Sequence, residues 1–129
     1  MRNMTRKAIN SPNAVKAGPY SHAVDTDPYV YLSGQTPIDP ATGRLIEGSI
    51  GDQTRQTFAN LFEVLKAGGL GPEHVVKCNV YLTNMADFAA MNEVYAQQFS
   101  EPFPARTTIG VAALPLGARV EIELIAKRS

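Results

Sequence analysis

Residues 52–82 read DQTRQTFANLFEVLKAGGLGPEHVVKCNVYL, and the spacing of the apolar residues changes once within this stretch. In the first half, 52–67, they lie three and four positions apart, at Phe58, Leu61, Phe62 and Leu65. This spacing predicts an amphipathic helix, and Gly68 and Gly69 suit a left-handed C-terminal cap. In the second half, 75–82, apolar and polar residues alternate, which predicts a strand. A helix followed directly by a strand indicates a fold that mixes the two.

The segments before this stretch predict a β-hairpin. Residues 21–24 and 29–33 are rich in β-forming side chains, and the DTDP sequence between them is typical of a tight turn. An irregular loop follows, with another short strand near Leu45.

The segments after it predict a second helix and two strands. Asn84 can cap this helix, and its apolar stripe consists of Phe88, Met91, Tyr95 and Phe99. Prolines at 102 and 104 end the helix, and two strands follow at 106–114 and 120–126. The predicted order is therefore ββαβαββ.

This order predicts a single α+β domain over residues 1–129. Right-handed crossovers place both helices on one face of a mixed sheet, which gives a two-layer structure. The other face of the sheet is left uncovered, and self-association is the expected way to cover it.

Composition limits the classes of partner. The 129 residues, 44% of them hydrophobic, suffice for one core, and twelve basic residues balance twelve acidic ones. A net charge of zero gives no reason to expect nucleic acid or an anionic membrane surface as a partner. A single cysteine, two histidines, and no long apolar run or export signal indicate a cytoplasmic protein without a disulfide or structural metal.

Arg106 is the most conspicuous candidate for binding. It opens an otherwise uncharged strand, and alternation places it on the same face as Thr108. A guanidinium remains charged and matches a carboxylate with two parallel hydrogen bonds, so an anionic ligand is one interpretation. A structural ion pair with Glu121 or Glu123 is the other, and the residues alone do not separate the two.

Each of the remaining candidate residues also has both a functional and a structural interpretation. Glu121 and Glu123 share one face of the last strand. They are either a pair of carboxylates for acid-base chemistry or part of a solvated sheet face. Asn92 lies on an apolar helical stripe and needs a hydrogen-bonding partner, either a ligand or a neighbouring backbone. Tyr20 can line a pocket or pack on its own domain, and Cys78 is expected to be a small buried apolar residue.

Several segments, in this order and spacing, resemble the Rid (YjgF-like) family, also known as the endoribonuclease L-PSP family. The segments are Gly18-Pro19-Tyr20-Ser21, Leu32-Ser33-Gly34-Gln35, Gln53-Thr54 through Asn60-Leu61, Met91-Asn92-Glu93-Val94-Tyr95, Phe103-Pro104-Ala105-Arg106, Leu114-Pro115 and Val120-Glu121-Ile122-Glu123. The match spans nearly the whole chain, and the segments together are more specific for the family than one short motif would be.

The resemblance implies a chorismate-mutase-like α+β sandwich assembled as a homotrimer, with active sites between subunits. It implies hydrolysis of enamine and imine intermediates, such as 2-aminoacrylate, 2-iminopropanoate and 2-iminobutanoate, to 2-keto acids and ammonia, without a cofactor. Arg106 would bind the substrate carboxylate, and Glu121 would orient or activate water. Five further residues are implied to bind the substrate or shape its pocket: Tyr20, Ser33, Gly34, Asn92 and Thr108, the last through its backbone.

Two positions depart from the common bacterial pattern of the family. His22 stands where Gln is expected, and Thr108 stands where Cys is frequent. His22 is expected to be an exposed strand residue, or else a titratable group near the pocket. Three other functions remain open: a non-catalytic sensor of small 2-keto acids, a catabolic deaminase of the 2-aminomuconate type, and a ribonuclease.

Overall fold

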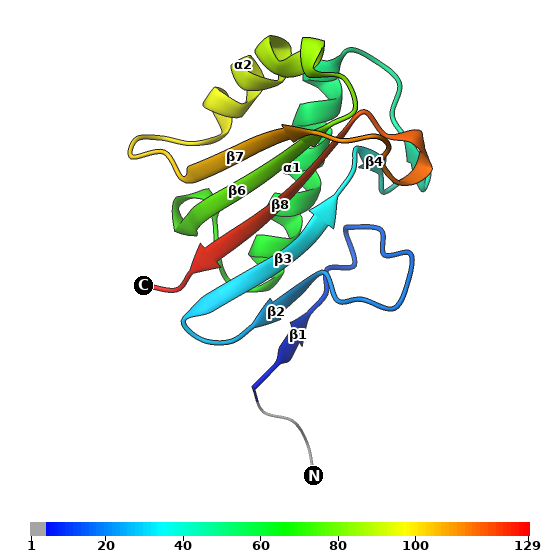
Figure 1. Cartoon of the computed structure of the whole chain (residues 1–129). Helices are drawn as coiled ribbons and strands as arrows, with labels where there is room; N and C mark the ends of the chain where they lie inside the picture. Colours follow the sequence, from blue (N-terminus) through cyan, green and yellow to red (C-terminus); the bar gives the residue numbers. More distant parts are fainter. Residues whose placement is uncertain (1–4) are drawn as a thin grey trace.

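The computed structural model describes residues 5–129, which form one six-stranded sheet, a separate two-stranded ribbon and two α-helices (Figure 1). The sheet has the strand order β1-β2-β3-β8-β6-β7. Its strands are β1 (Lys7–Ile9), β2 (Ala23–Asp25), β3 (Tyr29–Gln35), β6 (Val75–Leu82), β7 (Ala105–Gly110) and β8 (Val120–Lys127). The ribbon consists of β4 (Ile38–Asp39) and β5 (Arg44–Leu45), and the helices are α1 (Ile50–Ala67) and α2 (Phe88–Gln98). The β6–β7 pair is parallel, and the other pairs of the sheet are antiparallel.

The first helix begins two residues earlier than predicted. Ser49 is its N-cap, and it forms a reciprocal pair of hydrogen bonds with Asp52: the Ser49 Oγ accepts from the Asp52 N–H, and the Asp52 carboxylate accepts from the Ser49 N–H. The predicted left-handed cap is confirmed at Gly69, whose φ is +75°. Asn84 also caps as predicted, but it caps a 3₁₀ turn, Met85–Asp87, that leads into α2.

The predicted strands are largely confirmed. The hairpin, the strand over 75–82 and the last strand all form, whereas β7 ends at Gly110 and not at 114. The parallel ladder with β6 stops there because β6 itself ends at Leu82, whose carbonyl accepts the Val111 N–H. The edge strand β1 was not predicted, since three residues show no usable alternation.

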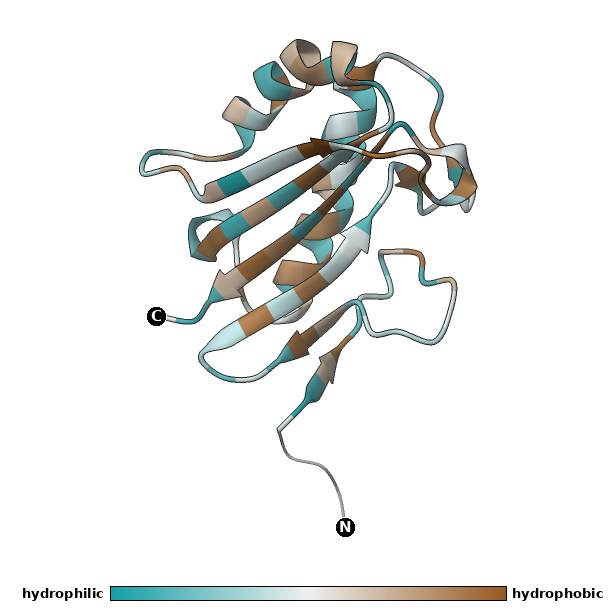
Figure 2. Ribbon diagram, in the orientation of Figure 1, coloured by the Kyte–Doolittle hydropathy of each residue, from teal (hydrophilic) through white to brown (hydrophobic). Residues whose placement is uncertain are grey.

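Both helices cover one face of the sheet, and the apolar residues of β6 and β8 point toward them. Phe58 and Leu61 of α1, Met91 of α2, Val80 of β6 and Ile122 of β8 are all fully buried in this layer. Figure 2 shows hydrophobic residues along the central strands of the sheet.

The opposite face of the sheet remains open in the single chain. Three large side chains on it are exposed: Tyr29 (40%), Tyr31 (47%) and Ile109 (45%). Their neighbours along β3, Val30 and Leu32, are buried on the helix side, as the alternation of a strand requires. No helix within residues 5–129 combines the length and apolar character needed to cross a membrane.

Replacement of Asn60 by alanine should lower the free energy of unfolding by about 1–3 kcal/mol, the cost of leaving buried polar groups without partners. Asn60 is 3% exposed, and its Nδ2 donates to the carbonyls of Thr36 (3.1 Å) and Ile38 (2.8 Å). Urea unfolding at one protein concentration measures the change. Gln56→Ala is the control: the Gln56 Nε2 donates to the Asn60 Oδ1 (2.9 Å), and its removal leaves both loop carbonyls paired with Asn60, so the effect should be smaller. Equal stability of Asn60→Ala and the wild type would contradict the expectation.

Candidate functional site

Arg106 lies at the edge of the sheet, under α2. Its Cα pairs with that of Cys78, which is buried on the helix side, so the arginine faces the helices. The Arg106 Nη1 donates to the Asn92 Oδ1 at 2.6 Å. Its Cζ lies 4.6 Å from the centre of the Tyr95 ring and 5.5 Å from that of Phe88. Two aromatic faces and one amide therefore orient the guanidinium.

The alternative of an ion pair between Arg106 and the strand glutamates is wrong. Glu121 and Glu123 lie opposite Tyr81 and Asn79 of β6, on the open face of the sheet. The Glu123 carboxylate accepts hydrogen bonds from both β6 side chains. None of the ion pairs found within residues 5–129 includes Arg106.

A pocket of about 380 Å³ lies beside the guanidinium. Its lining consists of Asn92, Tyr95, Ala96, Phe103, Pro104 and Arg106. The lining is mostly apolar and carries one cation, which suits a small organic acid with a short apolar tail.

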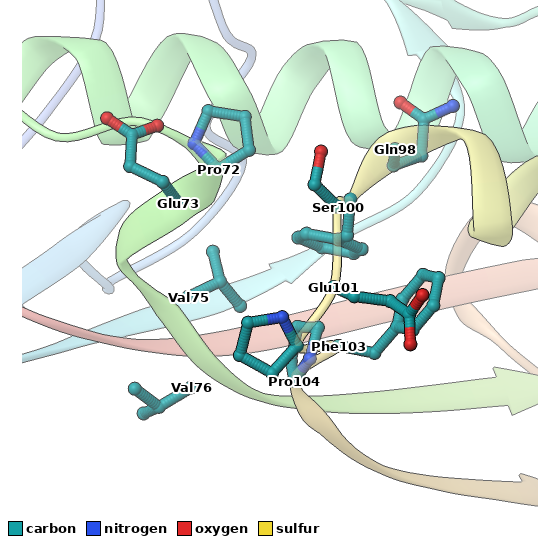
Figure 3. A pocket seen from close by; sticks show the side chains of 11 residues that line it. Pro72, Glu73, Val75, Val76, Gln98, Ser100, Glu101, Phe103 and Pro104 are labelled. Atoms are coloured by element: carbon teal, nitrogen blue, oxygen red, sulfur yellow. The ribbon is translucent and has the colours of Figure 1, made fainter.

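A larger hollow of about 620 Å³ lies on the other side of Phe103 and Pro104 (Figure 3). Figure 3 shows Glu73 and Glu101 on either side of it, and none of its lining residues is basic. Two carboxylates without a cation disfavour an anionic ligand. The smaller pocket beside Arg106 is therefore the better candidate for binding a carboxylate.

Asn92 and Thr108 lie on the same side as Arg106. Asn92 has a hydrogen-bonding partner, as expected, but this partner is neither a ligand nor the backbone: it is the Arg106 guanidinium. It takes one of the five N–H donors of that group. The Thr108 Oγ1 is buried and has no hydrogen-bonding partner within the described residues. Burial raises the pKa of the Cys78 thiol to about 11, which agrees with the expected inert apolar role.

The other predicted site residues form a second group at the end of β3 and the start of β8. A Cβ on Gly34 would stand 2.1 Å from the Glu121 Oε2, so only glycine lets this carboxylate lie against the β3 backbone. The Ser33 Oγ donates to the Ser21 carbonyl at 2.7 Å. Tyr20 precedes Ser21, is 40% exposed, and accepts the Ala17 N–H at its hydroxyl at 3.3 Å. Ser33, Gly34 and Glu121 are thus neighbours, with Tyr20 on the adjoining loop.

Glu121 has the electrostatic character of a base. Its burial raises the pKa of its carboxyl, and the negative charge of Glu123 raises it further. A raised pKa makes the carboxylate a stronger proton acceptor near neutral pH.

The two groups do not meet within one chain. Arg106, Asn92 and Thr108 lie on the helix side of the sheet, at its β7 edge. Glu121 and Gly34 lie on the open side, and β6 separates β8 from β7. One chain therefore presents two half-sites that face in different directions.

His22 is not the exposed strand residue of the first expectation, because it is buried (2% exposed), and each ring nitrogen has a backbone partner. Its Nδ1 accepts the Ser11 N–H at 2.9 Å, and its Nε2 lies 3.1 Å from the Val15 carbonyl. Because Nδ1 accepts, Nε2 carries the proton and donates. The ring therefore anchors the loop that leads to Tyr20, a role that no periodicity in the sequence signals.

Replacement of His22 by leucine should speed amide hydrogen exchange in loop 10–20 by about tenfold, as expected for the loss of roughly 1.4 kcal/mol of hydrogen bonding. Exchange followed by mass spectrometry measures this. The matched control is His74→Leu, because the His74 Nδ1 accepts the Gly71 N–H in a different loop. Unchanged exchange in loop 10–20 of His22→Leu, or the same change in the control, would refute the anchoring role.

Comparisons with known proteins relate the whole chain to one family. The sequence model of the family described as Endoribonuclease L-PSP matches residues 9–128. Protein DfrA of Myxococcus xanthus is 50% identical over 129 residues, covering 98% of each chain. A 2-iminobutanoate/2-iminopropanoate deaminase of Bos taurus is 46% identical over 127 residues, covering 98% of this chain and 93% of its own. The crystal structure of E. coli TdcF with bound serine is 39% identical with a TM-score of 0.90, covering 95% of this chain and 99% of that one.

Proposed function

The chain belongs to the endoribonuclease L-PSP family, known also as the Rid family, and from this premise we propose that it is an imine deaminase. Its substrates are 2-iminopropanoate and 2-iminobutanoate, with their enamine tautomers such as 2-aminoacrylate. The observation that carries this proposal is the Arg106 guanidinium, oriented by Asn92 beside a pocket of about 380 Å³ and left without a carboxylate partner among residues 5–129.

The relatives support this substrate class. The Bos taurus relative is named for the imines of two small 2-keto acids. The E. coli relative holds serine, which carries a carboxylate next to an amine-bearing carbon, as the proposed imines carry a carboxylate next to C=N. The pocket beside Arg106 has the charge that the shared carboxylate requires.

In the proposed reaction, Arg106 binds the substrate carboxylate and thereby fixes the position of the imine carbon. Glu121 takes a proton from water as the water oxygen bonds to that carbon and the C=N electron pair moves to nitrogen. That proton passes to the nitrogen and gives a carbinolamine. The carbinolamine hydroxyl then gives its proton, through Glu121, to the amine nitrogen, and its O–H electron pair forms the C=O bond as the C–N bond breaks, so that ammonia and the 2-keto acid leave. The imine carbon is already electrophilic, so positioning and one proton-transfer group suffice.

We further propose a homotrimer of the chorismate-mutase-like type, with each active site between two subunits. The half-site of Arg106 and the half-site of Glu121 lie on different sides of one chain, and a head-to-tail contact, in which one surface of a chain meets a different surface of the next, brings them together. Repeated from copy to copy, such contacts close into a ring, which we propose has three copies. The exposed Tyr29, Tyr31 and Ile109 supply apolar surface for the assembly.

Arg106→Ala should lower kcat/KM by about 100-fold, because two charge-assisted hydrogen bonds contribute about 3 kcal/mol. The assay couples the protein to a dehydratase that releases 2-aminoacrylate from serine and measures the rate of pyruvate formation. Arg55→Ala is the control, since Arg55 is an exposed helical arginine paired with Asp52. A folded wild type that binds 2-ketobutyrate in calorimetry but does not accelerate pyruvate formation would instead be a sensor of small acids.

Mixing two inactive variants tests whether the sites form between subunits. Arg106→Ala and Glu121→Gln should each be inactive alone, whereas subunits exchanged at equal amounts should recover about one quarter of the wild-type activity. Each site takes its arginine from one chain and its glutamate from another. Half of the chains keep Arg106 and the other half keep Glu121, so one site in about four has both residues. Sedimentation checks the number of chains, and a mixture that stays inactive after proven exchange would exclude shared sites.

A further inference from the structure

Glu123 is the most firmly held carboxylate on the open face of the sheet. The Asn79 Nδ2 donates to its Oε1 at 3.2 Å, and the Tyr81 hydroxyl donates to the same oxygen. Both donors come from β6, where Asn79 pairs with Glu123 itself and Tyr81 with Glu121. Donation to Glu123 helps raise the pKa of Tyr81 to about 12, so the phenol keeps its proton. Two donors on one oxygen hold the carboxylate in place.

Glu121 lies two residues from Glu123 on the same face of β8. At about 3.3 Å per residue, the two backbone positions are roughly 7 Å apart. Tyr81 lies opposite Glu121 on β6, and the uncharged Gly34 backbone of β3 lies against the Glu121 carboxylate. Lys77 is further along β6, where its Nζ donates to the Thr107 Oγ1. Within residues 5–129, Glu123 is thus the one acidic neighbour whose charge reaches Glu121 along its own strand.

We propose that Glu123 is a positioning residue for the deaminase reaction: held by Tyr81 and Asn79, its fixed negative charge makes Glu121 a stronger base toward the attacking water. The inference rests on the proposed function, in which Glu121 takes a proton from water. A like charge at this distance disfavours a second negative charge, so Glu121 binds a proton more readily. A base is most effective when its pKa lies near the working pH.

The opposite charge in the assembled site does not cancel this effect. In the proposed trimer the guanidinium of Arg106 enters the same site from a neighbouring copy, but the substrate carboxylate pairs with it. Among residues 5–129 no ion pair includes Glu123, and its hydrogen-bond donors, Asn79 and Tyr81, are both neutral. Its influence on Glu121 therefore persists when the substrate is bound.

The sign of the pH effect follows from the charge. Activity requires ionised Glu121, so it should rise with pH through the pKa of this carboxyl. Without the charge of Glu123 that pKa falls, and the rise in activity moves to lower pH. The weaker base also removes a proton from water more slowly, so the plateau of kcat falls.

Glu123→Gln should move the midpoint of the acidic limb of kcat to lower pH by about half a unit or more, and lower the plateau about threefold. KM should change less than twofold, because Arg106 binds the substrate. Glu123→Asp keeps the charge and should retain most of the wild-type profile. Glu47→Gln is the matched control, because it removes one exposed carboxylate that is distant in sequence from Glu121. It should leave the pH profile of kcat unchanged. An acidic limb that does not move in Glu123→Gln would overturn the proposal.

Carbon-13 NMR titration of glutamate carboxyls tests the same claim without the reaction, with Glu121→Gln identifying the Glu121 signal. The midpoint for Glu121 should be lower in Glu123→Gln than in the wild type, and an equal or higher midpoint would refute the inference. If the wild type shows no deaminase activity, the proposed function is rejected. The effect of Glu123 on Glu121 is then still tested, because the titration reports on Glu121 without the reaction. If Glu123→Gln does not fold, Tyr81→Phe serves instead. It frees Glu123 to turn toward solvent and should lower the Glu121 midpoint by a smaller amount.

Discussion

The alternation of side chains along a strand is the constraint on which this structure depends. Residues at odd and even positions of β7 and β8 must face opposite sides of the sheet, and α1 and α2 cover only one of these sides. Arg106 falls on the covered side and Glu121 on the open side. A shift of one residue in β8 would exchange its core residues for its polar ones, so the packing of Ile122 also fixes Glu121 on the open side.

The elements that could be predicted from the sequence are those with a long, clear period. The helix α1 and the strands β6 and β8 each show at least four apolar residues at the expected spacing, and all three form. The three residues of β1 pair only because β2 offers them an edge, and this tertiary effect leaves no local pattern. The length of β7 likewise depends on where its partner β6 ends.

For the site, the sequence indicated which residues share a face but not which face it was. Arg106 and Thr108 were expected on one side of their strand, and they do lie together. That this side is the helix side, where Asn92 and Tyr95 receive the guanidinium, depends on tertiary packing. The burial of His22 was missed for the same reason, since its two ring partners are backbone groups of a loop without periodicity.

Keeping the opposite charges on different faces has a chemical consequence. On one face, Arg106 and the two glutamates would neutralise one another, which would occupy the guanidinium and lower the basicity of Glu121. Separated by the sheet, the arginine keeps its donors for an acid, and Glu121 lies next to a like charge and not an opposite one. In the proposed assembly the groups meet across a boundary between chains, with the substrate carboxylate between them. Assembly would thus create the site and keep its charges from pairing before the substrate arrives.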